Sequence, residues 1–557
     1  MSTPPPDGLT HEELFAYAGR WIARIGASIV GQGGTPQQAL AAAQSARYKE
    51  VPQVTYVPVS YPDPFIEQVA QVTRALPPGI TVYLVGGAVR DALLGKPTHD
   101  LDFSLAGDVF QVSRKVADTL GAAFFPLDEQ RKTARLVLIR EDGSRVTYDF
   151  SALRGARLED DLRTRDFTVN AMALDVRQPA ALLDPLSGAA DLRANILRAC
   201  SPTAIPDDPV RVLRAVRIAA AYNLHMLPET RQQLHQAVPL LSRISPERVR
   251  DELFRIFAGP QPATCLRALD ILRVFSELMP EVLSLKRVEQ PLPHVTDAWR
   301  HTLEVVQKLE ILTKALSPHF NPDESANLAI GLASMKLGRY RQQIGKHLDQ
   351  LLNPDRSVRA LLFFSAFFHD IGKPETGRKD EKGVTRFIGH ERVGEEIAAA
   401  RAQALRLSNV EIDRVRLVVR GHLRPLLLAG SGQQPTRKAI YRFFKDTGPA
   451  GVDICLLSLA DLLGTYGPGL PTEVWANHLD VVSSLLEAWW EKPEESVSPP
   501  SLLNGRDLME MFHLEAGPVV GQLLAAVQEG QAVGVVLTRQ DAFDLAQKLL
   551  TRPPGSE

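Results

Sequence analysis

Segments with strand character occur only before about residue 190 of this 557-residue chain, and that confinement limits its fold more than any other feature. Four runs rich in β-branched and aromatic residues predict strands, at 81–87, 101–105, 135–140 and 145–150. We expect helices to begin near Ala88 and near Phe110, between successive strands. Helical periodicity dominates the later sequence. The pattern therefore predicts a small α/β head followed by a long all-α body.

The length of the chain predicts several domains, because one compact core stops growing well below this size. Proline-rich stretches at 51–64, 290–294 and 491–501 mark weak boundaries. Residues 1–50 carry no motif, and we expect two short helices there. The predicted parts are an N-terminal extension, the head, a helical neck, a second helical domain and a helical tail, over residues 1–60, 61–195, 196–294, 295–495 and 496–557.

Two aspartates, Asp100 and Asp102, lie two positions apart in the second predicted strand. Alternate side chains of a strand point to one face, so the two carboxylates are expected to repel each other there. A divalent cation relieves that repulsion, and Mg²⁺ takes carboxylates together with substrate phosphates as ligands. Such ions activate an attacking hydroxyl and stabilise a leaving pyrophosphate. Taken alone, the pair fits solvated aspartates on an edge strand better than a metal site.

A glycine pair, Gly86 and Gly87, ends the first predicted strand and begins a helix. Bare backbone N–H groups at such a turn can approach a phosphate closely, and Arg90 adds a positive charge one turn later. The basic residues between 131 and 260 are nearly all arginine. Arginine offers planar donors suited to phosphates and base edges, although charge alone fits a solvated helical surface equally well.

Composition favours a cytoplasmic protein. The net charge is -2, and the three cysteines, Cys200, Cys265 and Cys455, form no CxxC pair, which fits a reducing compartment. No apolar run is expected to span a membrane, and the first residues, MSTPPPDG, lack the regions of a signal peptide. We therefore expect no membrane partner.

Five segments occur in a fixed order between residues 60 and 290. They are GGAVRDALLG followed by DLD, LEDDLRTRDFTVNAMALD, LLDPLSGAADLRANILRA, DDPVRVLRAVRIAAAY and SPERVRDELFRIF. In this order they resemble the class II tRNA nucleotidyltransferases and bacterial poly(A) polymerases, within the polymerase-β-like superfamily. A further segment at 502–524, LLNGRDLMEMFHLEAGPVVGQLL, is similar to the tail of some members. The resemblance implies a nucleotidyltransferase head of polymerase-β-like fold.

The resemblance also implies roles for the residues that match in the first half of the head. Asp100 and Asp102 would hold Mg²⁺ and promote attack of an RNA 3′-hydroxyl on a nucleoside triphosphate. Asp149, in the last predicted strand, would be a third catalytic carboxylate. Gly87, beside Gly86, and Arg90 would contact triphosphate oxygens.

In the segment TRDFTVNA, the resemblance implies that Arg165 and Asp166 bind the ribose and phosphates of the incoming nucleotide, with Asn170 nearby. The family's usual motif has two arginines before the aspartate. Thr164 occupies the first of these places, so any role of that first arginine is in doubt.

Base choice is expected on the segment 207–222, read as one helix. Asp208 and Arg211 lie three positions apart and would share a helix face, presenting an acceptor beside a donor. Cytosine and adenine each offer an exocyclic amine beside an unprotonated ring nitrogen, so this pair would accept C and A and reject U and G. Arg214 and Arg217 would continue the basic stripe toward phosphates or RNA. The alternative is a set of salt bridges on a solvated helix.

A second set of residues lies in the body. AFFHDIGKPETG contains adjacent His369 and Asp370, an upstream predicted helix contains His301, and a downstream one contains Asp461. This order resembles the HD superfamily of metal-dependent phosphohydrolases, in which four such side chains hold a divalent ion. His390 and His422 would extend the site to a second ion. The identity of the metal does not follow from the residues.

The expected function is template-independent addition of C and A, from CTP and ATP, to the 3′ end of tRNA, with an HD domain that hydrolyses phosphates at RNA ends. Poly(A) synthesis is one alternative. Addition of CC alone is another, because only 15 residues separate Asp149 from Arg165, where enzymes that switch from C to A have a longer flexible segment. An HD phosphohydrolase with an RNA-binding head is a third, and intact Asp100 and Asp102 argue against it.

Overall fold

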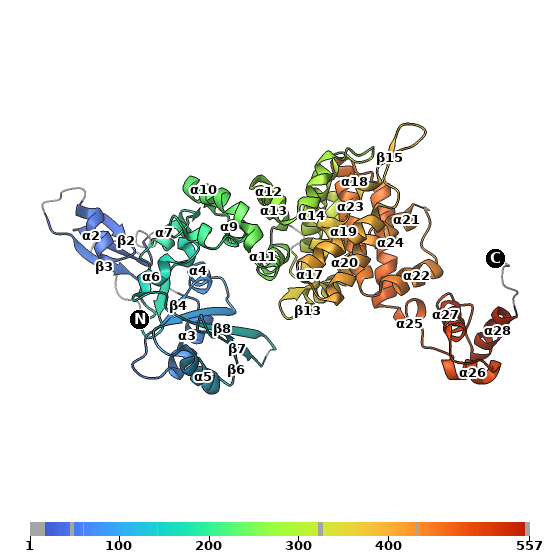
Figure 1. Cartoon of the computed structure of the whole chain (residues 1–557), viewed down its shortest axis with the longest axis horizontal. Helices are drawn as coiled ribbons and strands as arrows, with labels where there is room; N and C mark the ends of the chain where they lie inside the picture. Colours follow the sequence, from blue (N-terminus) through green and yellow to red (C-terminus); the bar gives the residue numbers. More distant parts are fainter. Residues whose placement is uncertain are drawn as a thin grey trace. The chain divides into compact units, whose positions relative to one another are not determined.

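The computed structural model describes residues 17–44, 50–59, 61–141, 143–320, 327–430 and 432–551. The chain folds into two compact units that meet in sequence between Leu241 and Ser242 (Figure 1). The first unit contains the strands of the head, and the second is almost entirely helical. The predicted succession of an α/β head and a helical body is therefore confirmed, whereas the finer division into five parts stays a prediction.

A seven-stranded mixed sheet forms the head, in the order β10-β9-β4-β5-β8-β7-β6. The four predicted strands are present as β4 (Val82–Val85), β5 (Asp100–Leu105), β7 (Thr133–Ile139) and β8 (Arg145–Ala152). Three more were not predicted: β6 (Ala123–Asp128), β9 (Ala173–Asp175) and β10 (Leu182–Leu183). The last two are too short to give a pattern, and β6 is an exposed edge strand interrupted by proline, where alternation is weak.

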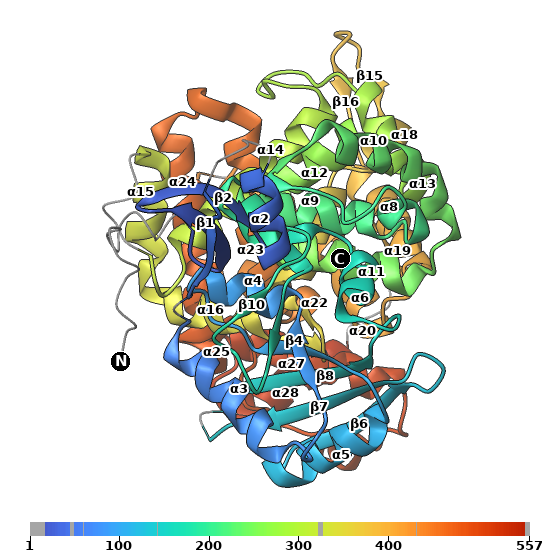
Figure 2. The ribbon, with the colours of Figure 1, turned by 90° about the vertical axis from the view of Figure 1, so that its left-hand side faces the viewer.

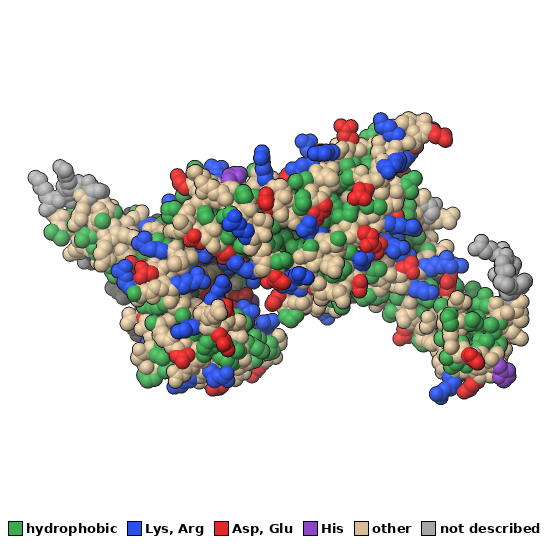
Figure 3. Space-filling view, in the orientation of Figure 1, with side chains coloured by type: hydrophobic (Ala, Val, Ile, Leu, Met, Phe, Trp, Pro, Cys, Tyr) green, Lys and Arg blue, Asp and Glu red, His purple; other side chains and the backbone are tan. Residues whose placement is uncertain are grey.

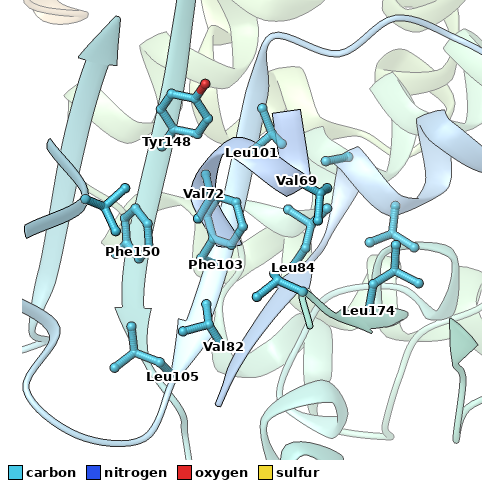
Figure 4. Packing of buried hydrophobic residues seen from close by; sticks show 14 of the residues in the cluster. Val69, Val72, Val82, Leu84, Leu101, Phe103, Leu105, Tyr148, Phe150 and Leu174 are labelled. Carbon is cyan, nitrogen blue, oxygen red and sulfur yellow. The ribbon is translucent and has the colours of Figure 1, made fainter. Parts of the chain in front are cut away.

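The core of the head lies between this sheet and two helices, α3 (Asp63–Ala75) and α5 (Val109–Leu120), which pack together beside the strands (Figure 2). The rings of Phe103 and Phe150 stack with centroids 4.9 Å apart at the centre of this core (Figure 4). Both side chains are fully buried and belong to neighbouring strands. Apolar residues therefore alternate along β5 with the two aspartates, which face the other way.

The other elements of the first unit connect or flank the sheet. They are α4 (Gly87–Leu93), α6 (Leu158–Arg163), η1 (Thr168–Asn170), α7 (Gly188–Arg193), β11 (Ile196–Leu197), α8 (Ala204–Asp207), α9 (Arg211–Tyr222), β12 (His225–Met226), α10 (Pro228–Ala237) and η2 (Val238–Arg243), which reaches the boundary with the second unit. The expected helix starts near Ala88 and Phe110 are confirmed by α4 and α5.

The N-terminal segment forms a small sheet together with one helix. Strands β1 (Arg20–Ile25), β2 (Ser28–Gly33) and β3 (Gln53–Val57) pair in the order β2-β1-β3, with α2 (Pro36–Gln44) packed on one face. Of the two short helices expected in residues 1–50, one is present as α2, and the hairpin of β1 and β2 was not predicted. The runs RWIARI and SIVGQG have β-branched and aromatic residues joined by a tight turn at Gly26, which is a hairpin pattern.

The second unit is built from helices. In chain order they are α11 (Pro246–Ala258), α12 (Pro262–Ile271), α13 (Val274–Leu278), η3 (Pro280–Arg287), α14 (Ala298–Ala315), α15 (Leu328–Leu337), η5 (Gly338–Tyr340), α16 (Arg341–Asp349), α17 (Val358–Phe368), α18 (Lys373–Thr376), α19 (His390–Ala404), α20 (Asn409–Gly421), α21 (Arg424–Ala429), α22 (Arg437–Thr447), α23 (Ala450–Tyr466), η6 (Gly467–Gly469), α24 (Thr472–Trp490), α25 (Pro493–Ser496), α26 (Gly505–Phe512), α27 (Pro518–Ala532) and α28 (Arg539–Leu550). Two short hairpins interrupt them, β13–β14 (Leu351–Asn353, Arg356–Ser357) and β15–β16 (Arg378–Lys379, Thr385–Arg386).

One helix among the described residues is long and apolar enough to cross a membrane by length and composition, spanning Ala450–Gly469. The expectation that no run reaches this length was therefore wrong. This helix is 89% buried inside the protein, where α14 and α20 pack against it, as in the core helix of a domain. Apart from Asp453, Ser458 and Asp461, its buried side chains are almost all apolar, as expected of a helix enclosed by other helices.

The small N-terminal sheet docks on the segment between β10 and α7. The Gln38 side chain donates to the carbonyl of Pro185 at 2.7 Å, and the Leu182 amide donates to the Tyr56 hydroxyl at 2.6 Å. A Cβ atom on Gly34 would lie only 1.6 Å from the carbonyl oxygen of Asp184. The close approach of the two backbones therefore requires glycine at residue 34.

We predict that Gly34→Ala detaches this sheet. Relieving the overlap should cost about 1–3 kcal/mol, which shifts the opening equilibrium by roughly fivefold to 150-fold. Hydrogen exchange measured by mass spectrometry should show faster exchange in β1 and β3 and unchanged exchange in β5 and β8. Gly331→Ala is the control, because a Cβ atom there meets open space. Unchanged protection of β1 and β3 in Gly34→Ala would contradict the tight docking.

Candidate functional sites

A cavity of about 340 Å³ opens in the first unit beside the sheet. Its floor is formed by Asp102 and Asp149, and four arginines line it: Arg154, Arg165, Arg211 and Arg214. Gly86, Gly87, Asp166 and Asn170 complete the set of predicted residues that line it. A polar hollow with two carboxylates at its base and arginines on its walls suits an anionic ligand that brings a cation with it.

The two floor carboxylates lie side by side because β5 and β8 are parallel, and Asp102 is in register with Asp149. Asp100 is exposed on the same face of β5 as Asp102, outside the lining of the cavity. Asp102 faces the cavity, but it is poorly hydrated between the protein walls, and this raises the pKa of its carboxyl. Arg165 lowers this pKa and the neighbouring Asp149 raises it, and the net shift is upward. The Asp102 carboxylate has no ion pair among the described residues, so these residues fit a divalent cation.

Asp149 is held in place by Arg135, a residue that the sequence did not suggest. The Arg135 guanidinium donates to both carboxylate oxygens of Asp149, each at 2.8 Å, from the next strand, β7. This bidentate pair fixes the plane of the carboxylate beside Asp102. A sequence signal for this pairing is absent, because it depends on the register between β7 and β8.

Gly86 provides space for the carboxylate as well as a bare backbone. It has a φ of +82°, a conformation that favours glycine, and a Cβ atom there would lie 3.1 Å from Oδ2 of Asp102. The same atom would lie 3.4 Å from Nη1 of Arg165. The turn between β4 and α4 therefore brings main chain, carboxylate and guanidinium together at one wall of the cavity.

Arg90 was expected to contact triphosphate oxygens, and the structure places it elsewhere. Its side chain is buried and does not line the cavity. The guanidinium donates to Asn170 Oδ1 at 2.5 Å, to the Tyr222 hydroxyl at 2.6 Å and to Asp91. The short helix α4 turns this side chain toward α9, so Arg90 positions Asn170, which does line the cavity.

Arg165 and Asp166 both line the cavity, each with a fixed partner. Arg165 donates to Asp161 Oδ2 at 3.0 Å and to the Ser104 hydroxyl at 3.2 Å. Burial alone would raise the pKa of Asp166, but Arg214, the Phe167 amide and Asn170 outweigh it and lower the pKa. The carboxylate of Asp166 is therefore stabilised in its charged form within the wall of the cavity.

Asp161 is a buried residue of the cavity wall that sequence reasoning missed. Its position four residues before Arg165 was the available signal, since such pairs interact along a helix. Thr164, at the place of the family's first arginine, donates its hydroxyl to the carbonyl of Asp161, and its own carbonyl accepts from Arg211. Thr164 thus closes the end of α6 instead of supplying a charge.

Asp208 and Arg211 do not lie on one helix, contrary to the prediction. Segment 207–222 is broken, because α8 ends at Asp207 and α9 begins only at Arg211. Pro209 follows Asp208, and the residue before a proline avoids helical backbone angles. The two side chains still approach to 3.8 Å, but only Arg211 lines the cavity. Three backbone carbonyls fix the Arg211 guanidinium, those of Thr164, Arg165 and Ala204.

The second predicted site gathers in the core of the second unit. His301 comes from α14, His369 and Asp370 follow α17, and Asp461 comes from α23. His301 Nε2 lies 3.0 Å from Asp461 Oδ1 and 3.4 Å from Asp370 Oδ2, and His369 Nε2 lies 3.2 Å from Asp370 Oδ2. All four side chains are buried. The structure therefore brings the four predicted ligands together.

Two further histidines face the other oxygen of the same aspartate. His390 Nε2 lies 3.3 Å and His422 Nε2 3.9 Å from Asp370 Oδ1. Asp370 is thus shared between two clusters of metal-ligand type, one with His301 and His369 and one with His390 and His422. The shared carboxylate gives the geometry of a two-ion centre.

The histidine tautomers fit a metal better than a hydrogen-bond network. Nδ1 of His390 faces the Phe387 carbonyl at 2.7 Å, and Nδ1 of His422 faces the Val419 carbonyl at 2.6 Å. A carbonyl can only accept, so each Nδ1 carries the ring proton and donates a hydrogen bond. In the neutral rings both Nε2 atoms therefore carry lone pairs. These two acceptors point at each other across 3.4 Å. A cation between them satisfies both, and this arrangement is the usual orientation of metal-binding histidine.

Lys373 also contacts the shared aspartate, and sequence reasoning did not single it out. Its ammonium lies 2.6 Å from Asp370 Oδ2 and 2.5 Å from Gln290 Oε1. Burial would raise the pKa of Asp370, yet His369 and Lys373 hold it well below its usual range. The available signal was the spacing of three residues between Asp370 and Lys373.

We predict that Asp370→Ala removes tightly bound divalent metal, because it deletes the only ligand common to both clusters. Metal retained after dialysis, measured by mass spectrometry of Mn²⁺-loaded protein, should fall at least tenfold relative to the unaltered chain. Asp102→Ala is the matched control, since it alters a carboxylate of the other unit, and it should retain this metal. Equal retention by both variants would contradict a two-ion centre at Asp370.

Three family models match this chain in succession. They are described as the Poly A polymerase head domain over residues 82–198, the probable RNA and SrmB-binding site of polymerase A over 223–285, and the HD domain over 298–463. The last two cover the helices after the head and the cluster around Asp370. The head-domain match contains Asp102 and Asp149, and the HD-domain match contains Asp370.

Relatives align over most of the chain. An A-adding tRNA nucleotidyltransferase of Deinococcus radiodurans is 32% identical over 486 residues, covering 86% of this chain and 98% of that protein. A CC-adding tRNA nucleotidyltransferase of Thermus thermophilus is 32% identical over 464 residues, covering 82% and 91%. A solved CCA-adding enzyme in its apo form I shares the fold, with a TM-score of 0.54 and 18% identity over 89% of this chain and 96% of that chain. The chain therefore belongs to the family of tRNA nucleotidyltransferases and poly(A) polymerases that carry an HD domain.

Proposed function

We propose that the head adds C and A nucleotides to the 3′ end of tRNA without a nucleic-acid template. The observation that carries this proposal is the pair Asp102 and Asp149, held in register at the floor of an arginine-lined cavity. The names of the relatives support the choice of tRNA as the acceptor and of CTP and ATP as donors. The three cysteines are free thiols, which supports the cytoplasm as the location.

In this proposal Asp100 and Asp102 hold Mg²⁺, with Asp149 as the third carboxylate. Bound Mg²⁺ would lower the pKa of the attacking hydroxyl and neutralise the leaving pyrophosphate. The RNA 3′-oxygen forms a bond to the α-phosphorus, the bond from that phosphorus to the pyrophosphate oxygen breaks, and the hydroxyl proton is lost. Arg165 and Arg214 bind the phosphates together with the Gly86–Gly87 backbone.

Base choice is assigned to Arg211 with Asp208 beside it. Because three carbonyls fix the plane of the Arg211 guanidinium, its N–H groups keep one direction at the cavity wall. Asp208 supplies the neighbouring acceptor for an exocyclic amine when it turns toward the base. A donor beside an acceptor matches cytosine and adenine and rejects uracil and guanine.

Two narrower activities compete with full CCA addition. One relative is named A-adding and another CC-adding. These names favour enzymes that add only part of the CCA end. The connection between Asp149 and Arg165 is also short, and its second half is the helix α6, tied by Asp161 to Arg165. Poly(A) synthesis is the remaining alternative.

One experiment tests the head assignment and its specificity. Purified protein is incubated with Mg²⁺, each labelled nucleoside triphosphate and tRNA that ends before the CCA, after C or after CC. Incorporation of C or A alone is expected, and the mapped 3′ end identifies full, CC-only or A-only addition. Long A tracts would instead identify a poly(A) polymerase.

In the same assay Asp100→Ala and Asp102→Ala should each reduce incorporation below detection, because the metal loses a carboxylate. Binding of tRNA should stay within about threefold of the unaltered chain, since phosphate contacts are distributed over many arginines. Retained transfer in either variant would refute the assignment of these carboxylates.

We propose a second activity, the hydrolysis of phosphates at RNA ends, for the two residue clusters that share Asp370. These clusters are called the HD centre below. The Asp370 carboxylate shared by two histidine pairs supports it, since two ions held in this way generate hydroxide and polarise phosphate. For a 2′,3′-cyclic phosphate, a water oxygen bonds to phosphorus, one ribose oxygen leaves, and that oxygen takes a proton. Lys373 lies beside Asp370, close enough to contact a bound phosphate.

We predict that the two activities are separable. Asp370→Ala should abolish hydrolysis of a 2′,3′-cyclic phosphate and of a 3′-phosphate, and nucleotide addition should stay within about twofold of normal. The reason is that Asp370 and Asp102 belong to different compact units. Loss of CTP incorporation in an Asp370→Ala protein with an unchanged circular dichroism spectrum would show instead that the sites are interdependent.

A further inference from the structure

A short hairpin projects from the second unit between two residues of the HD centre. It consists of β15 and β16, which pair antiparallel and join residues that follow Lys373 to residues that precede His390 (Figure 1). Asp380 closes its tip by accepting hydrogen bonds from the amides of Lys382 and Val384. The hairpin is therefore a built element with a defined turn.

The base of the hairpin is tied to the metal-binding residues. The Phe387 carbonyl holds Nδ1 of His390 at 2.7 Å, and the Phe387 ring lies 5.6 Å from the Lys373 ammonium. The backbone at Gly372 also approaches His390 closely, since a Cβ atom there would lie 2.2 Å from the His390 carbonyl oxygen. A ligand that contacts the hairpin base therefore lies next to the centre.

The exposed surface of the hairpin carries more basic than acidic side chains, although Glu381 is exposed between Lys379 and Lys382. Arg378, Lys379, Lys382 and Arg386 are exposed, and lysine and arginine side chains are visible along this projection (Figure 3). Arg386 pairs with Asp380, which helps to hold the turn. Within the described part of the chain, the ammonium groups of Lys379 and Lys382 have no ion-pair partner. Unpaired lysines on a projecting hairpin suit a polyanion.

An apolar side chain completes the surface on the side of the metal centre. Ile388 is 87% exposed and lies two residues before the ligand His390. A large aliphatic side chain that is exposed to this degree beside the HD centre can pack against a ribose or a base. The hairpin thus combines apolar contact near the centre with positive charge farther away.

We propose that this hairpin guides a single RNA strand into the HD centre, so that the substrate is the phosphorylated end of a polynucleotide and not a free nucleotide. This inference rests on the hydrolase activity proposed above. From Gly377 to the start of the turn at Asp380 the strand extends roughly 10 Å, at about 3.3 Å per residue. Nucleotides rise about 3.4 Å each along a helical strand, so the lysines reach phosphates several nucleotides from the end.

The test compares two substrates of the same chemistry. The metal-loaded full chain and its Lys379→Glu/Lys382→Glu variant are given tRNA ending in a 2′,3′-cyclic phosphate and, separately, 2′,3′-cyclic AMP. The variant should lose at least tenfold in kcat/KM for the RNA and stay within twofold for cyclic AMP. The slope of log kcat/KM against log salt for the RNA should become shallower by about 1.4, at roughly 0.7 for each lost contact.

A matched control reverses two exposed lysines elsewhere in the same unit, Lys346→Glu on α16 and Lys548→Glu on α28, and should leave both substrates unaffected. Equal loss on both substrates, or no loss on either, would overturn the guiding role of the hairpin. Hydrolysis of cyclic AMP but not of RNA by the unaltered chain would preserve the hydrolase and refute the polynucleotide substrate. Hydrolysis of neither would refute the hydrolase, and this inference with it.

Discussion

The parallel pairing of β5 with β8 is the constraint on which the head depends. It places two carboxylates side by side, which costs electrostatic free energy that the fold offsets locally. Arg135 holds one carboxylate, and the glycine at residue 86 leaves room for the other. The apolar faces of the same strands form the core, so the register that brings the aspartates together is fixed by the packing of Phe103 against Phe150.

Much of the head was predictable because its motifs combine local pattern with chemistry. Strand alternation correctly placed Asp100 and Asp102 on one face of β5, and the glycine pair was correctly placed at a strand-to-helix turn. What could not be predicted depends on partners distant in sequence. Arg90 turns away from the cavity because its guanidinium donates a hydrogen bond to the hydroxyl of Tyr222, far along the chain. Likewise, no local pattern reveals that Arg135 lies opposite Asp149.

The errors in local structure have identifiable causes. Asp208 was assigned to a helix because the spacing to Arg211 is helical, but the proline at residue 209 delays the start of that helix. The N-terminal strands were missed because a single short hairpin gives a weak pattern without knowledge of the surface on which it docks. In the second unit, the order of the residues predicted which candidate ligands cluster, but the position of Asp370 between two clusters required the fold.

The histidines of the HD centre are oriented by the ends of helices. His369 and His422 each follow the last turn of a helix, α17 and α20, and face the carbonyl three residues earlier through Nδ1. Together with His301 on α14 and Asp461 on α23, the ligands come from helices distributed over most of the domain. A bound ion would therefore act as a cross-link between helices that are separate in sequence. Part of the free energy of metal binding would then appear as resistance of the whole helical domain to unfolding.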